Sequence, residues 1–432
     1  MNRATRRSQT IVFSRLGTGG GAEGTLTDWA KAVLQNGHDC DVLIGKSTVW
    51  QRIRLGREIR RFVGRTAGQL AVGSLCRSLD LWVSPSVALG DFFFEARHRL
   101  TALRFVLDPR RFRARKILQR AETVLVGNVL TPRGLKELRV ACKSASLVLH
   151  HNGSPTGFSE DWLRRASDRV GSRLGDQQTY FEVFSWVVFQ SATHREAFDE
   201  MYPGTRQDTA LVWPSADEPK VAGYAATSSP FHSGTFNLVA VGKFQAAKNQ
   251  LQTLKAFLAI SQKYPSTHLT LVGGSISDRR YLSECVDFIT RNDLSNRVSL
   301  VGFRVDATRY LAHADLGVHL AVGDGVSRAV REAAFLKKPM IIASDPGNRS
   351  FLGPEAAVVV DPSNVDQVAE AFSVMVDSAE RRNQVATAAY RAYSSKASWP
   401  LFASNVQTFF ETVDSGAAVL RQAPSSANVR RG

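Results

Sequence analysis

The chain has 432 residues, of which 44% are hydrophobic and 22% charged, a composition ordinary for a soluble globular protein of two or three domains. Its four cysteines lie far apart without a CxxC pair, so we expect neither a disulfide framework nor a zinc site. The N-terminus lacks the apolar run of a signal peptide, and no uncharged apolar stretch of about 18 residues occurs. We therefore expect a cytoplasmic protein without a spanning helix.

The net charge of +16 belongs almost wholly to the first third of the chain. Residues 1–150 hold 26 Lys and Arg against 11 Asp and Glu, and the remaining residues hold 29 against 28. Two basic segments, 52–65 and 97–120, interleave arginines with apolar and aromatic side chains. Segments of this kind can bind an anionic membrane surface. The alternative is that they form a basic face of the protein that is exposed to solvent. Because no recognised nucleic-acid module accompanies the charge, we do not expect nucleic acid as a partner.

The chain opens with a predicted strand at 11–13, a Gly-rich loop at 17–24, a helix ending near Gly37, and a strand at 42–44. The loop formally matches the dinucleotide fingerprint GxGxxA. That fingerprint needs an acid at the far end of the second strand, where this chain has Gly45 and Lys46. An NAD(P)-dependent oxidoreductase is thus only an alternative. Residues 39–41 also spell DxD, a metal motif, but their place at the start of a strand favours a strand role.

Further strands are predicted at 122–127, 146–150, 187–191 and 211–214. His150, His151 and Asn152 stand where the second of these ends, so they are candidate ligand-binding residues. The segment 226–236 is rich in Ser, Thr, Gly and Pro and reads as an interdomain linker.

After that segment, an apolar strand ends in Lys243, and Lys248 follows five residues later. Two cations at the end of a strand can stabilise a diphosphate leaving group without a metal. Strands at 269–274 and 298–303 follow, with Gly273 and Phe303 at their ends.

Residues 315–347 read as a strand, a polar loop, a helix and a second strand. The loop carries Asp324, Gly325, Val326 and Ser327, and Glu332 lies on the helix. The first N–H groups of a helix have no internal partner and suit a phosphate. Carboxylates accept hydrogen bonds from hydroxyls, so the combination favours a phosphorylated sugar.

These stretches resemble the retaining glycosyltransferases of the GT-B fold, in the large group 4 (glycosyl transferases group 1). The family pattern of two Glu separated by seven residues, then PVIASDxGG, is matched here by D-G-V-S-R-A-V-R-E-A and by PMIIASDPG. The family motif VGRLxxxK is matched by residues 241–248, and the opening GGAE by Gly20, Gly21 and the two residues after them. Asp324 replaces the first Glu, and Lys243 replaces the Arg.

The resemblance implies an α/β protein with two Rossmann-like domains facing across a cleft. The expected division is an acceptor-binding domain at 1–225, the linker at 226–236 and a nucleotide-sugar-binding domain at 237–395. A helix at 396–414 would cross back to the first domain, and a disordered tail would occupy 415–432.

The implied activity is metal-independent, retaining transfer of a hexose-type sugar from a nucleotide diphosphate to a hydroxyl. Asp324 would contact the sugar, Glu332 the ribose, and Lys243 and Lys248 the diphosphate. Backbone N–H groups at Gly325–Ser327 would contact the phosphate, and His151 or His150 would face the donor. In the family the turns after two strands hold the nucleotide base, and here Gly273 and Phe303 are the candidates for that contact. No cofactor is expected. The membrane-facing charge favours a glycan or lipid-linked acceptor on the inner face of the membrane. A non-catalytic transferase-like subunit remains an alternative, because two motif residues are substituted.

Overall fold

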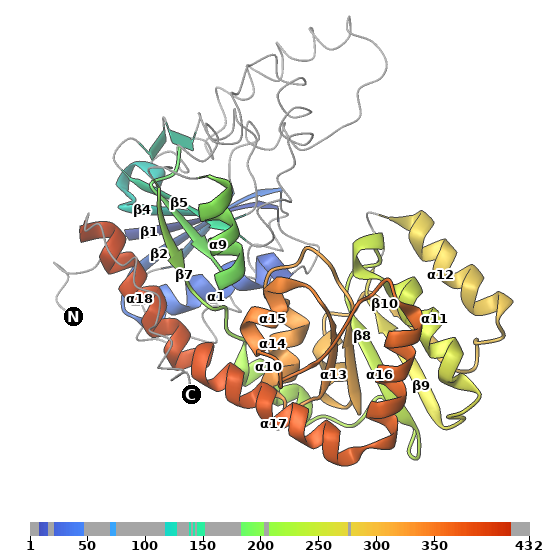
Figure 1. Ribbon diagram of the computed structural model, residues 1–432. Helices are drawn as coiled ribbons and strands as arrows, with labels where there is room; N and C mark the ends of the chain where they lie inside the picture. The colour runs from blue at the N-terminus through green and yellow to red at the C-terminus, as the bar shows by residue number, and fades with distance from the viewer. Residues whose placement is uncertain are drawn as a thin grey trace, which may run out of the picture.

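The computed structural model describes residues 8–15, 21–46, 70–74, 117–127, 138–139, 141–142, 145–151, 183–202, 207–274 and 278–415. In these residues the chain builds two parallel β-sheets, each covered by helices, which lie side by side and are spanned by the last two helices (Figure 1). The basic segment 52–65, most of the segment 97–120 and all of the predicted tail except Ser415 lie outside the described residues.

The first sheet has seven parallel strands in the order β3-β2-β1-β4-β5-β6-β7. Their bounds are β1 Ser8–Arg15, β2 Asp39–Lys46, β3 Leu70–Ser74, β4 Thr123–Gly127, β5 Ser146–His151, β6 Trp186–Phe189 and β7 Asp208–Leu211. The order reverses between β1 and β4, and ligands of open α/β sheets bind at the carboxyl ends of the strands beside such a reversal. The first crossover helix, α1, spans Gly21–Gln35, ahead of Gly37 with its φ of 83°.

The second sheet has six parallel strands in the order β10-β9-β8-β11-β12-β13. Their bounds are β8 Phe236–Val241, β9 Thr267–Val272, β10 Val298–Gly302, β11 Leu316–His319, β12 Met340–Ala343 and β13 Val358–Val360. The helices are α11 Gln250–Ser261, α12 Arg279–Arg291, α13 Ala307–Ala312, α14 Arg328–Phe335, α15 Pro346–Leu352, α16 Val365–Asp377 and α17 Ala379–Lys396. Here the order reverses between β8 and β11, the two strands that lead to Lys248 and Asp324.

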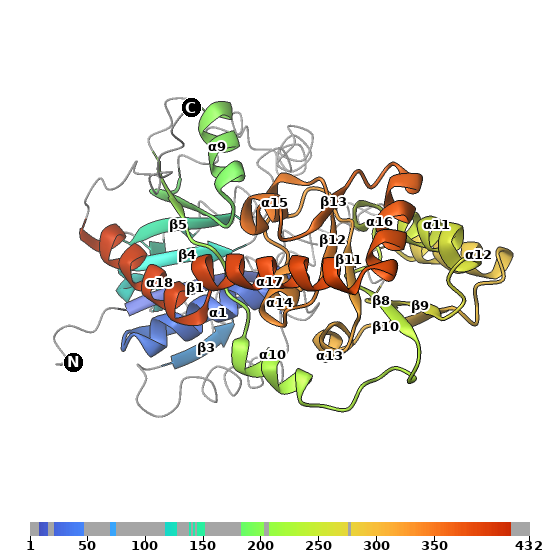
Figure 2. The same ribbon diagram turned by 60° about the horizontal axis from the view of Figure 1, so that its bottom comes forward.

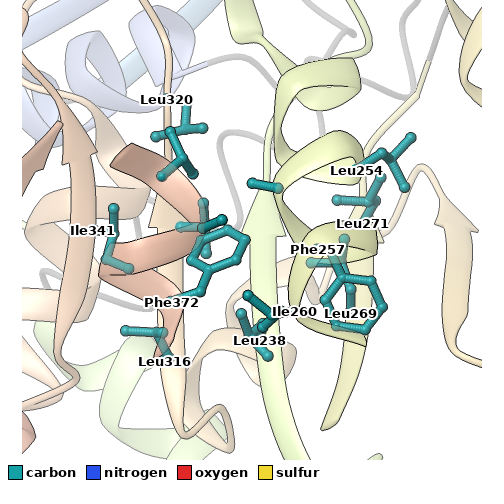
Figure 3. Packing of buried hydrophobic residues seen from close by; sticks show 14 of the residues in the cluster. Leu238, Leu254, Phe257, Ile260, Leu269, Leu271, Leu316, Leu320, Ile341 and Phe372 are labelled. Atoms are coloured by element: carbon teal, nitrogen blue, oxygen red, sulfur yellow. The ribbon is translucent and has the colours of Figure 1, made fainter. Parts of the chain in front are cut away.

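Apolar side chains alternate between the two faces of each sheet, so each domain has a core on both sides. In the second domain Leu238, Leu269 and Leu316 point from the strands towards Phe257 of α11 and Phe372 of α16 (Figure 3). The opposite face packs against α14, α15 and α17. This packing fixes the ends of the strands, from which the candidate residues extend.

The two domains are joined at two adjacent crossings. The first leads from β7 into α10 (Glu218–Ala225), and the second from α17 into α18 (Trp399–Ser415), which packs against α1 of the first domain (Figure 2). One oxygen of Glu218 accepts hydrogen bonds from the Tyr393 hydroxyl (2.7 Å) and the Trp399 N–H (2.8 Å). The Tyr393 hydroxyl also accepts from the N–H of Ala216 (3.2 Å). These hydrogen bonds hold the two crossing segments against each other.

Two strands of the first sheet differ from what the sequence predicted. The strand expected at 211–214 lies earlier, at Asp208–Leu211, because the apolar residues after it leave the sheet and pack at the domain junction. β3 was not predicted at all. In the DxD stretch, Cys40 is buried in the core and Asp41 pairs with Arg120 at 2.7 Å, so these residues serve the strand, as expected.

Candidate functional site

The carboxyl end of β8 and the short helix after it place two lysines. Lys243 follows the strand, and Lys248 ends the 3-10 helix η3 (Ala246–Lys248). Asn249 then takes a left-handed conformation with φ 55°, and its side-chain amide donates to the carbonyl of Leu320 at the end of the neighbouring strand (2.8 Å). The N–H of Val322 donates to the carbonyl of Ala247 (2.9 Å). These two hydrogen bonds hold η3 against the loop that carries Asp324.

Lys248 and Asp324 form an ion pair at this junction. The ammonium group lies 2.6 Å from Oδ1 of Asp324, and Nε2 of His319 lies 3.2 Å from Oδ2. His319 is the last residue of β11 and is buried, whereas the side chains of Lys248 and Asp324 keep 21% and 27% of their exposure. The carboxylate is thus held from two sides but stays accessible to a ligand.

The environment of Asp324 favours its ionised form. Burial raises the pKa of this carboxyl, but the hydrogen bond from His319 and the charge of Lys248 outweigh burial and hold the pKa well below its usual range. Asp324 is therefore an anion with acceptor capacity for a hydroxyl across the neutral pH range.

Gly273 brings the ends of β8 and β9 together. A Cβ at this position would lie 1.8 Å from the carbonyl oxygen of Gly242, so only glycine fits beside the backbone that leads to Lys243. Its N–H donates to the carbonyl of Gly302 (2.9 Å). Phe303 follows β10 and is 52% exposed, so its ring is open to stacking on a planar ligand.

Helix α14 begins at Arg328, directly after Ser327, as the sequence predicted. The N–H of Ser327 donates to the side-chain carbonyl of Asn348 (2.9 Å), and a Cβ at Gly347 would lie 2.7 Å from the carbonyl oxygen of Gly325. Gly325 and Val326 are buried. The loop is thus seated tightly on the N-terminus of α15.

Glu332 lies one turn into α14, is 6% exposed, and has a partner on each oxygen. Oε1 accepts from Nε of Arg328 (2.8 Å), and Oε2 accepts from the hydroxyl of Thr308 (2.8 Å). Each carboxylate oxygen has a second lone pair, so Glu332 can still accept from a ligand hydroxyl.

The two candidate histidines of the first domain are buried at the end of β5. The His150 ring packs edge-on against Trp29, with centroids 5.5 Å apart, and the His151 ring lies 5.4 Å from that of Phe189. Consecutive residues of a strand face opposite sides of the sheet, which explains why the two rings have different neighbours. Of the other first-domain candidates, Gly21 is the first residue of α1, while Gly20 and Asn152 lie outside the described residues.

Sequence reasoning missed several polar side chains around these residues, among them His194. This residue lies on α9 (Ala192–Met201), is 3% exposed, and its Nε2 has no hydrogen-bond partner in the described part of the chain. Burial lowers the pKa of its imidazole, and the carboxylates of Asp345 and Asp324 act in the opposite direction. No motif marks this position, because only the packing of α9 on α15 brings it towards the second domain.

The chain is similar to known proteins over the region that holds most of the candidate residues. Residues 235–378, which contain Lys243, Lys248, Asp324 and Glu332, match the family model described as glycosyl transferases group 1. An uncharacterized glycosyltransferase of Methanocaldococcus jannaschii is 27% identical over 123 residues, a match that spans 28% of this chain and 29% of that relative.

Two solved structures share the fold over nearly the whole chain. Anabaena HepE in complex with UDP-glucose has a TM-score of 0.67 at 18% identity, covering 94% of this chain and 99% of that chain. Sucrose-phosphate synthase from Thermosynechococcus elongatus has a TM-score of 0.67 at 13% identity, covering 95% and 100%. The predicted GT-B fold is therefore confirmed.

Proposed function

We propose that this chain, whose C-terminal domain belongs to the glycosyl transferases group 1 family, transfers a sugar from a nucleotide diphosphate to an acceptor hydroxyl. The observation that carries the proposal is the meeting of Lys248 and Asp324 at the point where the strand order of the second sheet reverses. A cation for a diphosphate and a carboxylate for sugar hydroxyls are the two groups that a nucleotide-sugar donor requires. HepE, with UDP-glucose bound, supports a nucleotide-sugar ligand for this fold.

In this proposal the donor lies along the carboxyl ends of β8 to β11. Lys243 and Lys248 bind the diphosphate, Asp324 accepts from hydroxyls of the sugar, and Glu332 accepts from the ribose. Gly273 shapes the base pocket, Phe303 offers an aromatic face, and the Gly325–Val326–Ser327 loop presents backbone groups to the phosphate. The N–H of Ser327 already donates to the side chain of Asn348. Within that loop the phosphate would therefore accept hydrogen bonds from the N–H groups of Gly325 and Val326.

The proposed chemistry proceeds with retention on the front face of the sugar. The bond between the anomeric carbon and the β-phosphate oxygen breaks as the acceptor oxygen bonds to the same carbon. The proton of the acceptor hydroxyl passes to the departing phosphate oxygen, so no protein base is needed. Lys243 and Lys248 stabilise the charge that develops on this phosphate, which is the role that a metal ion fills elsewhere. The arginine that the family has at this position carries a planar guanidinium group with several fixed donors, whereas the ammonium group of lysine acts as a point charge. Lys243 therefore holds the phosphate in a less fixed orientation.

We further propose a glycan or lipid-linked acceptor, bound by the first domain, in the assembly of cell-surface polysaccharide or glycolipid. The support is the excess of basic residues in positions 1–150. We propose that the basic segments 52–65 and 97–120 bind the protein to the inner face of a membrane through their positive charge. Within the described residues no helix is long and apolar enough to cross a membrane. If the protein fails to co-sediment with anionic liposomes at low salt, the proposed membrane binding is contradicted.

A non-catalytic role is the second candidate, because the Lys248–Asp324 ion pair occupies both groups that a donor would need. The two roles differ in turnover. An enzyme transfers the sugar and loses this activity in Asp324→Ala, whereas a non-catalytic subunit transfers no sugar and keeps its role in that variant.

A thermal-shift screen against UDP, GDP, ADP and their common sugars tests the proposal. A ligand that binds only the native state raises the midpoint of unfolding. At a concentration 100 times its dissociation constant it adds about 2.7 kcal/mol to the free energy of unfolding. We expect one base to stabilise the protein selectively, and Lys248→Ala to lose that effect. Arg291→Gln, an exposed change on α12, is the matched control and should keep it. The absence of any shift in the wild-type protein would contradict the donor site.

A further inference from the structure

A cluster of charged side chains fills the junction between the two domains. Three cations face three carboxylates there: Lys31, Arg328, Arg331, Asp28, Asp217 and Glu332. Five of the six are between 1% and 6% exposed, and the Arg328 side chain is 22% exposed. Charges buried this deeply are tolerated only when they are paired, so the cluster depends on both domains being in place.

Arg328 is the member that joins the two domains at the candidate site. Its Nε donates to Oε1 of Glu332 at 2.8 Å, and its Nη1 lies 3.6 Å from Oδ2 of Asp28 on α1. The guanidinium group can serve two carboxylates at once because its donors point in several fixed directions. The adjacent turn adds a second link, since Nη2 of Arg331 donates to the hydroxyl of Thr25 (2.8 Å).

Gly24 shows that α1 is shaped to receive this arginine. A Cβ at position 24 would lie 1.8 Å from Nη1 of Arg328. Glycine inside a helix is less favourable than alanine, and here its absent side chain leaves the space that the guanidinium group occupies. The clash would involve the end of a flexible side chain, so an alanine at position 24 would displace the arginine without unfolding the helix.

We propose that Arg328 is a positioning residue that acts through Glu332 and makes donor affinity depend on the seating of α1. The proposal rests on the proposed function, in which Glu332 accepts hydrogen bonds from the donor ribose. Arg328 fixes the carboxylate in one orientation and balances its charge in a site with almost no solvent. Without it, Thr308 alone would hold Glu332, and the carboxylate would be a less well-ordered acceptor.

Asp28 distinguishes positioning from a general role in folding. Neither of its oxygens has a hydrogen-bond partner in the described residues. Burial raises the pKa of this carboxyl against the opposing charges of Arg328 and Lys31, so ionised Asp28 is held at an energetic cost. If Asp28 becomes neutral, Lys31 keeps its pair with Asp217 at 2.7 Å. Arg328 stays within reach of Glu332, but it loses its charged contact on α1 and is no longer held in one orientation. Asp28→Asn should therefore leave the midpoint of thermal unfolding unchanged or raise it, while it weakens donor binding.

The test is calorimetric titration of UDP, GDP and ADP into the full chain and its variants. We expect Gly24→Ala and Arg328→Gln each to weaken binding of the preferred nucleotide about tenfold. The double variant should bind as Arg328→Gln alone does, because the shorter glutamine leaves nothing for the new methyl group to displace. Arg328→Lys keeps the positive charge but lacks the planar guanidinium group, so it should bind the nucleotide more tightly than Arg328→Gln and less tightly than the wild type. The control variant Arg291→Gln should bind as the wild type does.

The outcomes separate this inference from the function beneath it. If the wild type binds a nucleotide and Gly24→Ala or Asp28→Asn binds it equally well, Arg328 does not couple α1 to the donor site, and the inference alone fails. Additive losses in the double variant would also overturn it, since Gly24 would then act by another route. If the wild type binds none of the three nucleotides, the proposed function fails and this inference fails with it.

Discussion

The ammonium group of Lys248 lies 2.6 Å from the carboxylate of Asp324, although the two residues are 76 positions apart in the chain. In the proposed function the lysine binds a phosphate and the carboxylate binds a sugar hydroxyl. Binding of the donor must therefore replace this ion pair with two separate contacts. The pair holds both groups at the correct place before the donor arrives, and both side chains are partly exposed, so the exchange requires little desolvation.

The exchange makes a prediction for Asp324→Ala. Removal of the carboxylate frees Lys248 for the diphosphate, so affinity for the nucleoside diphosphate should stay equal or rise. Transfer should fall by at least about a hundredfold, because an interaction with the sugar in the transition state is lost. Calorimetry with the nucleotide and a turnover assay that measures nucleotide release provide the two readings. Unchanged turnover would show that Asp324 makes no contact with the sugar in the transition state, and lost nucleotide affinity would place Asp324 on the phosphate instead. A wild-type protein that binds the nucleotide but shows no turnover would belong to the non-catalytic class.

The lowered pKa of Asp324 makes a prediction for the pH dependence of stability. A group whose pKa is lowered in the folded state stabilises the fold above its ordinary value, here 3.8, and loses that contribution as the pH falls towards the lowered value. Asp324→Asn leaves Lys248 and His319 without their anion, so we expect a loss of about 1–3 kcal/mol between pH 5 and 7. Urea unfolding of wild type and variant should show this difference narrowing as the pH is taken from 5 towards 3. A difference that is constant with pH would contradict the role of the ion pair.

Gly273 and Gly223 form a matched pair of glycine substitutions. At position 273 an added Cβ would strike the backbone of Gly242, whereas at position 223, on α10, it would meet nothing within 4 Å. Gly273→Ala should therefore destabilise the protein by about 1–3 kcal/mol and weaken nucleotide binding, because the end of β8 beside Lys243 must shift. Gly223→Ala should stabilise it by up to about 1 kcal/mol, since alanine is the better helix former. Thermal unfolding measures both changes, and equal effects would argue against the close approach at Gly273.

Much of the second domain could be predicted from sequence because its signals are local. Each of its strands is a short apolar run before a turn, and α14 begins where the loop residues before Arg328 predict it. The order of Lys243, Lys248, Asp324 and Glu332 along the chain was visible in the motifs. The meeting of Lys248 and Asp324 follows from the general rule that parallel strands present their carboxyl ends at one edge.

Other parts of the site are set by contacts that no local pattern records. His319 looks like one more residue of a buried strand, and only the fold shows that its ring reaches Asp324. Arg328 has a charged partner on its own helix at Glu332, a common surface arrangement, so its second partner on α1 could not be anticipated. β3 could not be recognised because it is a strand of only five residues, LAVGS, which contains a glycine and follows a long basic segment.

A crystal structure of the protein with the nucleotide sugar selected by the thermal-shift screen is the most direct test of the central claim. We predict that the diphosphate will contact Lys248 and Lys243 at the carboxyl ends of the second sheet, and that Asp324 will have left Lys248 for a hydroxyl of the sugar. A nucleotide bound instead by the first domain, with the Lys248–Asp324 pair intact, would contradict the account and favour the dinucleotide-binding alternative.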